Sequence, residues 1–169
     1  MGVSLPFSEL IRAAEESNVR LEMIRGVAVW EASPVFLHQQ EIKRIVGSIK
    51  RLSSTGCACI DTQDTLFRFA DGSFKRLDVA LLCAMPDAVD ADEVLTVIPA
   101  AVVEVLSKDY EYKDLVLSPP FYLENGVLDV LIYDPRTGVV LHYRPDRPAP
   151  QSLTSPVHLS LECGCEITV

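Results

Sequence analysis

Two stretches in the first third of the chain carry apolar residues at helical spacing. Residues 5–17 predict a short amphipathic helix that ends near Asn18, because one face collects Leu5, Leu10, Ile11 and Ala14. Residues 38–52 predict a second, longer helix. Its apolar stripe is Ile42, Ile45, Val46, Ile49 and Leu52, and its outer face is basic: Lys43, Arg44, Lys50 and Arg51.

Most other apolar segments are short and predict strands. Residues 95–107, LTVIPAAVVEVLS, are the most apolar stretch and predict a central strand of a sheet. Residues 109–125 have mixed helical character, and Pro119 and Pro120 must end or kink that helix unless they open its first turn. The remaining expected elements are a hairpin at 19–32, strands with an Asp71-Gly72 turn at 57–83, an acidic loop at 87–93, a hairpin at 127–145, and one or two short strands in the tail.

This order of elements predicts an α/β (α+β) protein in which helices flank a mixed sheet. At 169 residues, we expect one domain spanning 1–169, long enough to bury a core. No apolar run approaches the roughly 20 residues of a membrane span. The N-terminus has no basic region followed by an apolar one, so we expect a cytoplasmic protein with no membrane partner.

The charge balance is acidic. The net charge is −9, with 15 basic and 24 acidic residues, and this argues against non-specific coating of nucleic acid. The basic residues of 38–52 nevertheless offer a local surface for DNA, formed by Lys43, Arg44, Lys50 and Arg51.

The five cysteines form two C-x-C pairs, at 57–59 and 163–165, plus Cys83. Four thiolates are enough for zinc, although the usual structural spacing is C-x₂₋₄-C. In a strand, C-x-C also places two small apolar side chains on one face. We therefore favour reduced, packed thiols over zinc.

Two carboxylates stand on apolar strands, Asp78 in RLDVALLC and Glu104 in AAVVEVLS. A buried carboxylate must neutralise, find a partner or bind a metal. If the two strands are neighbours, the carboxylates converge, and a divalent cation is the natural reason for two like charges to do so. The alternative is a pair of strand-edge acids bonded to lysine or arginine.

Four segments in order resemble one family. RLEMIRGVAVWEASPVFLH is similar to an E-x₃-G opening followed by Ser-Pro and a His that starts a helix. RLDVALL resembles an R-x-P-D-V-A strand, PAAVVEVLS a P-x₂-V-V-E-V-L-S strand, and DLVLSPPFYLENGVLDVLIYDP the segment that follows. The family is the bacterial group known as putative restriction endonucleases, abundant in cyanobacteria, a branch of the PD-(D/E)xK nuclease superfamily.

The resemblance implies a restriction-endonuclease-like fold and a metal-dependent endonuclease acting on DNA. Asp78 and Glu104 match the two metal-binding acids, joined by the backbone carbonyl of Val105, and Mg²⁺ or Mn²⁺ suits such oxygen ligands. Glu22 matches an acidic position in the opening hairpin, near the metal or its water. His38 matches the start of a helix, where we expect a capping or packing role. A homodimer is plausible, since cutting a duplex commonly uses two sites.

The chain departs from the family pattern at its lysine. Leu77 replaces the proline before Asp78, and Leu106 stands where the superfamily has its lysine. The family uses instead a lysine on the next helix, and that position is Ser118 here. Two lysines are candidate substitutes: Lys108, just past the strand, and Lys113, which lies about 140° away from position 118 around an ideal helix.

Two other functions stay open. A catalytically inactive homologue that keeps the fold as a binding or assembly module would explain Ser118 and the acidic charge. A β-rich ligand-binding protein without a nucleic-acid role would have no metal affinity and would leave Glu104 paired to a basic side chain.

Overall fold

The computed structural model describes residues 6–31, 33–87, 94–109 and 111–169. Within these residues the helical elements are α1 (Phe7–Glu16), α2 (Phe36–Val46), the π-helical turn η1 (Lys113–Leu117) and α4 (Ser118–Glu124). The strands are β1 (Arg20–Ile24), β2 (Val27–Glu31), β3 (Lys50–Arg51), β4 (Ile60–Arg68), β5 (Phe74–Leu82), β6 (Ala101–Val105), β7 (Asp129–Asp134), β8 (Val139–Tyr143), β9 (Gln151–Thr154), β10 (His158–Ser160) and β11 (Cys165–Thr168).

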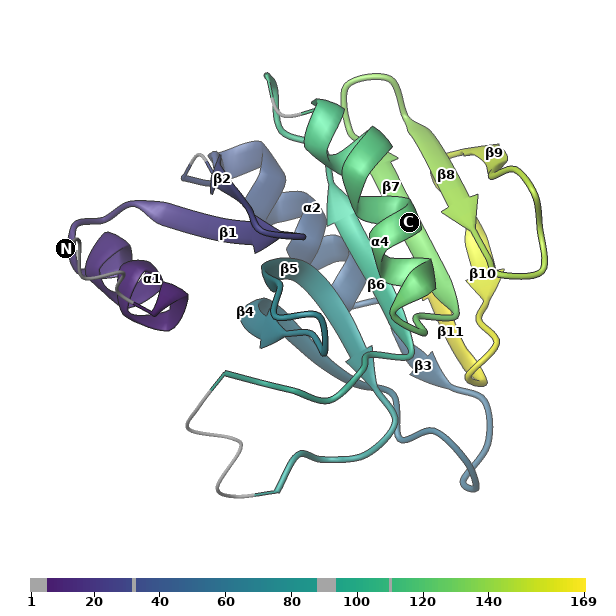
Figure 1. Cartoon of the computed structure of the whole chain (residues 1–169). Helices are drawn as coiled ribbons and strands as arrows, with labels where there is room; N and C mark the ends of the chain where they lie inside the picture. Colours follow the sequence, from purple (N-terminus) through teal and green to yellow (C-terminus); the bar gives the residue numbers. More distant parts are fainter. Residues whose placement is uncertain (1–5, 32, 88–93, 110) are drawn as a thin grey trace, which may run out of the picture.

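The described strands form two sheets (Figure 1). The larger has the order β2-β1-β5-β6-β7-β8-β9, with β4 also paired to β5, and the smaller has the order β10-β11-β3. The β6–β7 pair is parallel and the other pairs are antiparallel, so the larger sheet is mixed. The predicted fold class is confirmed.

Strand β5 has an unusual edge. β4 pairs with β5 along its whole length, from Phe74 to Leu82. On the opposite edge, β1 pairs only at Phe74, and β6 pairs only from Val79 to Leu81. The edge of β5 between these two contacts therefore has no strand beside it, and the candidate site is built there.

Two apolar clusters cover opposite faces of the larger sheet. Strand β6 shows why, since successive side chains point to opposite faces: Val103 enters one cluster and Val102 the other. The first cluster contains Ile45 from α2 and Ile167 from β11, whereas the second contains Phe121 and Tyr122 from α4. Helices α2 and α4 thus lie on opposite sides of β6 (Figure 1).

The first helix and all three predicted hairpins are confirmed. The turns lie where expected: Arg25-Gly26 separates β1 from β2, Asp71-Gly72 separates β4 from β5, and residues 135–138 separate β7 from β8. Gly26, Gly72 and Gly138 all have positive φ, which explains glycine at these turns. The predicted acidic loop at 87–93 lies, apart from Asp87, outside the described residues.

The predicted helix over 38–52 is wrong in its second half. Helix α2 ends at Val46, and the chain then forms β3, which pairs with β11 from the C-terminus. Ser48 stabilises this change, because its hydroxyl donates to the carbonyl of Ile45 at 2.6 Å and accepts from the Thr168 backbone N–H at 2.8 Å. The basic residues are consequently divided between α2 (Lys43 and Arg44) and β3 (Lys50 and Arg51).

Two further expectations need correction. The central strand is shorter than predicted, since β6 covers only Ala101–Val105, and Val97 and Ile98 are exposed. The tail contains β9 as well as the two short strands expected there. The cysteines are not all reduced thiols: Cys57 is bonded to Cys83 and Cys59 to Cys165, while Cys163 is free.

Candidate active site

Two carboxylates complete the open edge of β5. The backbone N–H of Arg76 donates to Glu22 Oε1 at 2.7 Å, and the N–H of Asp78 donates to Glu104 Oε2 at 3.3 Å. Glu22 comes from β1 and Glu104 from β6, the two strands that flank this edge. Buried backbone N–H groups require partners, so the two acids replace the missing strand.

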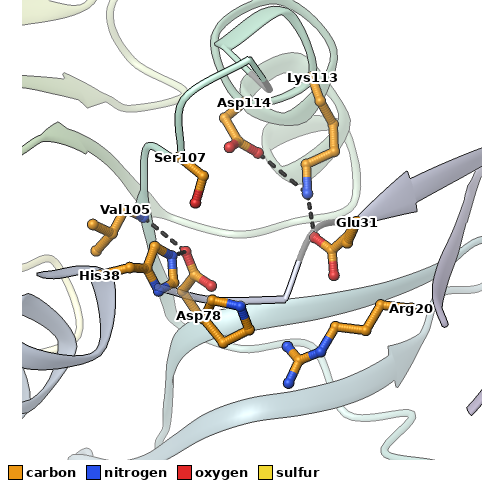
Figure 2. Close-up of a pocket in the computed structure, with 9 residues that line it drawn as sticks. Arg20, Glu31, His38, Asp78, Val105, Ser107, Lys113 and Asp114 are labelled. Atoms are coloured by element: carbon orange, nitrogen blue, oxygen red, sulfur yellow. Dashed lines mark hydrogen bonds and ion pairs between the residues drawn. The ribbon is translucent and has the colours of Figure 1, made fainter. Parts of the chain in front are cut away.

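Asp78 lines a pocket at this point (Figure 2). Its Oδ2 atom accepts from the Val105 backbone N–H at 2.8 Å and lies 3.1 Å from His38 Nε2. Among the described residues, no hydrogen bond reaches its Oδ1 atom. The side chain is 22% exposed, so Asp78 is held through one oxygen and is available through the other.

Lys113 also reaches the pocket (Figure 2). Its ammonium bonds to Glu31, lies 3.2 Å from Glu22 Oε2 and lies 3.5 Å from Asp114 Oδ1. The π-helical turn η1 explains this orientation, since the Ser118 N–H donates to the carbonyl of Lys113, five residues earlier. An i→i+5 turn is wider than an α-helical one, and it brings positions 113 and 118 towards the same face.

Lys75 is a second lysine in the site, and it is fully buried. Its ammonium donates to Ser118 Oγ at 2.8 Å and lies 3.6 Å from Glu22 and 3.9 Å from Glu104. It also lies 4.9 Å from the centre of the Tyr122 ring. A lysine ammonium from β5 thus occupies the space beside position 118.

Acids outnumber bases in this cluster. Two lysines, Lys75 and Lys113, face five carboxylates: Glu22, Glu31, Asp78, Glu104 and Asp114. The nearby Arg20 guanidinium is already paired, with both terminal nitrogens bonded to Asp64 at 2.6 and 2.7 Å.

The pKa values reflect this excess of negative charge. Burial, reinforced by Asp78, holds the pKa of Glu104 well above its ordinary value. Burial and the neighbouring Glu22 raise the pKa of Glu31 to about 7, and burial also raises the pKa of Asp114. Burial alone would lower the pKa of His38, but the hydrogen bond to Asp78 and its charge raise it. Such perturbed groups around one pocket are typical of functional sites.

The donor set fits a hard divalent cation. Asp78 and Asp114 both line the pocket, and Asp114 Oδ1 is buried without a hydrogen-bond partner in the described part of the chain. Among the described residues, only cysteine sulfurs form groups of three ligand atoms within 4.8 Å. The carboxylates around the pocket do not form such a group, so they would supply only part of a coordination shell, and Mg²⁺ is an ion that keeps waters and substrate oxygens among its ligands.

Most predicted site residues come together in the structure. Asp78, Glu104, Glu22 and Lys113 are in contact or share partners. Lys108 is exposed at the end of β6 and lies outside the residues that line the pocket. Lys43 and Arg44 lie in the last turn of α2, whereas the pocket is at its first turn, and Lys50 and Arg51 lie in β3.

Sequence reasoning did not assign Glu31, Asp114, His38 or Lys75 to the site. His38 contacts Asp78, so the predicted capping or packing role is incomplete. Its spacing carried the signal, since His38, Ile42 and Ile45 share the buried face of α2. Lys75 was missed as well, although it stands beside the apolar Phe74 and Leu77 in FKRLDVALL, where a strand enters the core.

A family model covers residues 7–169, nearly the whole chain; the family is Uma2, described as "Putative restriction endonuclease". The chain belongs to the Uma2 family. A solved structure described as a putative nuclease belonging to DUF820, from Anabaena variabilis, is similar with a TM-score of 0.62 and 17% identity. The match covers 83% of this chain and 80% of that one, and it shows a shared fold. No curated protein matches.

The Uma2 match includes every element that builds the site, from α1 to β11. The resemblance inferred from four short segments is therefore confirmed at the level of the family. Within the described residues, no helix has the length and apolar character needed to cross a membrane.

Proposed function

We propose that this Uma2 chain is a Mg²⁺- or Mn²⁺-dependent endonuclease that hydrolyses phosphodiester bonds of DNA. The observation that carries the proposal is the open edge of β5, where the Asp78 backbone N–H donates to Glu104 beside a pocket lined by Asp78, Glu31 and Asp114. Membership of a family described as "Putative restriction endonuclease", and the likeness to a structure described as a putative nuclease, support the same chemistry.

Asp78, Glu104 and the backbone carbonyl of Val105 would hold the cation. Asp78 offers Oδ1, because His38 and the Val105 N–H already hold Oδ2. Glu104 is oriented by the Tyr122 hydroxyl, which donates to Oε1, and by the Asp78 N–H, which donates to Oε2, and it would bind the cation through a remaining lone pair. When bound, such a cation activates a water molecule and stabilises charge that develops on the phosphate.

Lys113 takes the role of the family lysine in this proposal. It is the lysine that lines the pocket, and the π-helical turn directs it there from a position five residues before Ser118. Glu22 holds both Lys113 and Lys75, so it positions the cationic groups instead of contacting the substrate. Lys75 is fully buried and offsets the charge of Glu22 and Glu104.

DNA is the proposed substrate despite the net charge of −9. Repulsion between an acidic protein and DNA predicts weak binding that depends on the divalent cation. The four basic residues of 38–52 are divided between α2 and β3, and Arg44 is paired with Glu41, so their contact with DNA is a secondary proposal. A homodimer that places two pockets on one duplex also remains a proposal.

An inactive homologue that serves as a binding or assembly module is the second candidate. The observation that favours it is the internal pairing of the site, because Lys113 is already bonded to Glu31 and Lys75 to Ser118. In that case the acids and lysines stabilise one another, and neither group is free for a substrate.

Cleavage of a supercoiled plasmid, with Mg²⁺ or Mn²⁺ and with chelator, separates the two candidates. We expect the wild type to cut only with the cation, Asp78→Asn to be inactive, and the control Asp61→Asn, an acid on β4 outside the pocket, to behave like the wild type. Cleavage by Asp78→Asn, or silence from the wild type with both cations, contradicts the nuclease proposal.

The variant Ser118→Lys provides an independent test of the role of position 118. If position 118 were simply an empty lysine site, this variant would gain activity. We expect instead no gain and lower stability, because Lys75 already places an ammonium 2.8 Å from Ser118 Oγ and two like charges would share one buried space.

A further inference from the structure

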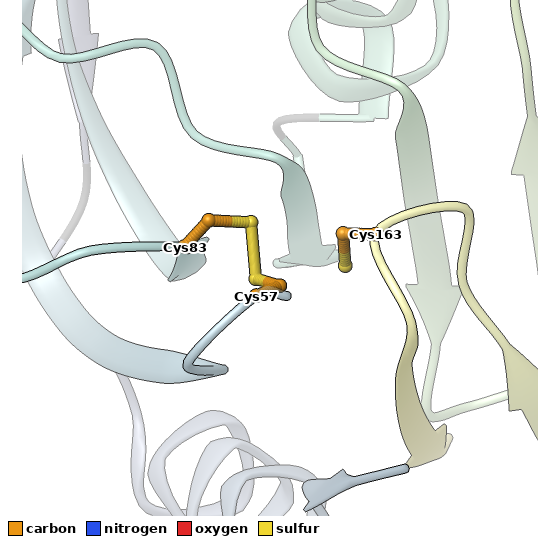
Figure 3. A group of neighbouring side chains, drawn as sticks. All are labelled: Cys57, Cys83 and Cys163. Carbon is orange, nitrogen blue, oxygen red and sulfur yellow. A yellow bond between two sulfur atoms is a disulfide. The ribbon is translucent and has the colours of Figure 1, made fainter. Parts of the chain in front are cut away.

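The five cysteines gather at one place, although they span more than a hundred residues. Cys57 and Cys59 precede β4, Cys83 follows β5, and Cys163 and Cys165 lie at the start of β11. The structure joins Cys57 to Cys83 and Cys59 to Cys165, and leaves Cys163 as a thiol beside the first pair (Figure 3). The cluster lies where the smaller sheet meets the ends of β4 and β5.

The sulfur atoms belong to two groups that share Cys57. Those of Cys57, Cys59 and Cys165 lie within 4.8 Å of one another, and so do those of Cys57, Cys83 and Cys163. Cys57 Sγ lies 3.7 Å from Cys165 Sγ, to which it is not bonded. In a tetrahedral thiolate site with Zn–S of about 2.3 Å, neighbouring sulfurs are about 3.8 Å apart. The 3.7 Å between Cys57 Sγ and Cys165 Sγ, which belong to different disulfides, therefore matches the edge of such a tetrahedron.

The surroundings also suit a closed structural site. Cys165 is fully buried and Cys57 is nearly so, and both belong to the apolar cluster beneath α2. Cys59 and Cys163 pack against the same cluster, while Cys83 is exposed. Buried thiolates need a counter-charge, and Zn²⁺, an ion that binds soft thiolate ligands, supplies it.

We propose that the reduced cluster binds one Zn²⁺ through Cys57, Cys59 and Cys165, with Cys83 or Cys163 as the fourth ligand. The disulfide form and the zinc form are then alternative states of one site. Conversion to the zinc form breaks two S–S bonds, and two equivalents of a dithiol reductant supply four electrons and four protons and become disulfides themselves. The four thiols release their protons to solvent as four Zn–S bonds form.

Both states connect the same parts of the fold. The bond between Cys59 and Cys165 closes a separation of 106 residues and joins the segment before β4 to β11. Zinc ligated by the same two residues preserves that connection when the disulfides are reduced. The smaller sheet would thus stay attached to the larger one under reducing conditions, which otherwise open both disulfides.

The test uses the full chain, purified with a phosphine reductant and without chelator. We expect native mass spectrometry and elemental analysis to find one zinc per chain, and Co²⁺ in its place to give the visible absorption of a tetrahedral thiolate site. Cys57→Ser should lose the metal. Cys83→Ser and Cys163→Ser should differ, because only the variant that removes the fourth ligand should lose the metal. Asp78→Asn is the matched control and should keep zinc.

Two results would overturn the proposal: a reduced wild-type chain that contains no zinc, or zinc that persists in Cys57→Ser. Because Cys57 lies in the core, a serine there can unfold the chain on its own, so the Co²⁺ spectrum of the wild type provides the second measurement. An octahedral spectrum would also overturn a thiolate site.

Discussion

Two strands carry the same tripeptide, Leu-Asp-Val, at residues 77–79 and 128–130, yet the two aspartates have different surroundings. Both lie beside a histidine: Asp78 Oδ2 is 3.1 Å from His38 Nε2, and Asp129 Oδ1 is 2.7 Å from His142 Nε2. Asp129 is fully buried, whereas the side chain of Asp78 is 22% exposed at a pocket.

The two aspartates differ most in the hydrogen-bond donors that surround them. Asp129 Oδ1 accepts also from Arg144 Nε at 2.8 Å, and Oδ2 accepts from the Glu162 backbone N–H at 2.8 Å. Burial would raise the pKa of Asp129, but these bonds lower it. Around Asp78 the neighbours are largely acids, and the pKa of the adjacent Glu104 is held well above its usual range by burial and by Asp78.

A buried acid becomes a functional candidate when the protein supplies too few hydrogen-bond donors and positive charges around it. The bonds around Asp129 balance its charge within the protein, and its contribution is to stability. The acids around Asp78 lack enough positive charge from the protein, and this lowers stability unless a cation binds.

Lys113→Met should reduce the cleavage rate by about 10²–10³-fold, because it removes a positioned cationic donor at the pocket. Lys108→Met, an exposed lysine outside the residues that line the pocket, is the matched control and should retain nearly full activity. Plasmid cleavage at saturating Mn²⁺ measures both, and thermal unfolding shows whether Lys113→Met still folds. Equal activity in the two variants would mean that Lys113 serves only to pair the buried acids.

Asp129→Asn should lower the free energy of unfolding by about 3 kcal/mol, since it removes the buried carboxylate that pairs with His142 and Arg144, and only Arg144 keeps another acid, Glu162. The pKa of Asp129 is lower in the folded chain, so its contribution is present above the unfolded value near 3.9 and is lost as the pH falls through the folded value. Denaturant unfolding from pH 7 to pH 3 should show the wild type and the variant converging. A constant difference across that range would contradict this assignment.

His38→Ala should weaken Mn²⁺ binding by about 10–100-fold, the usual cost of losing a partner that orients a metal ligand. His142→Ala is the counterpart beside Asp129 and should lower stability while leaving Mn²⁺ affinity unchanged. Titration calorimetry and thermal unfolding of both variants measure the two effects. If His38→Ala binds Mn²⁺ as the wild type does, His38 has only a packing role.

Glu104→Gln should raise stability in metal-free buffer by about 0.5–2 kcal/mol, the common range for a stabilising substitution, because it removes a carboxylate whose charged form burial disfavours. The pKa of Glu104 is raised on folding, so its stabilising effect is present at low pH and is lost as the pH rises through the folded value. The gain should therefore be largest above neutral pH. A variant that is less stable than the wild type at pH 8 would show that Lys75 already balances Glu104.

The acids of the site could be predicted from sequence, and the lysines only in part. Asp78 and Glu104 interrupt apolar strands, and Glu22 follows from the family pattern, so local sequence is sufficient for them. The direction of Lys113 depends on a π-helical turn, which no helical periodicity indicates. The burial of Lys75 depends on Glu22 and Glu104, which belong to strands distant in sequence.

The fold shows the same division between local and distant effects. The hairpins follow from glycine turns and apolar alternation, and they lie where predicted. The end of α2 and the strand β3 depend on β11, which lies more than a hundred residues away in sequence and pairs with residues 50 and 51. The pairing of cysteines likewise depends on the three-dimensional arrangement, and spacing alone did not indicate it.

Mn²⁺ binding by three purified chains tests the central claim most directly: the wild type, Asp78→Asn and Asp129→Asn, measured by titration calorimetry together with thermal unfolding. We predict that the wild type binds Mn²⁺, that Asp78→Asn does not bind it but unfolds at the same temperature or higher, and that Asp129→Asn binds it but is less stable. Undiminished binding by Asp78→Asn, or loss of binding by a folded Asp129→Asn, would contradict the assignment of the metal site to the pocket beside β5.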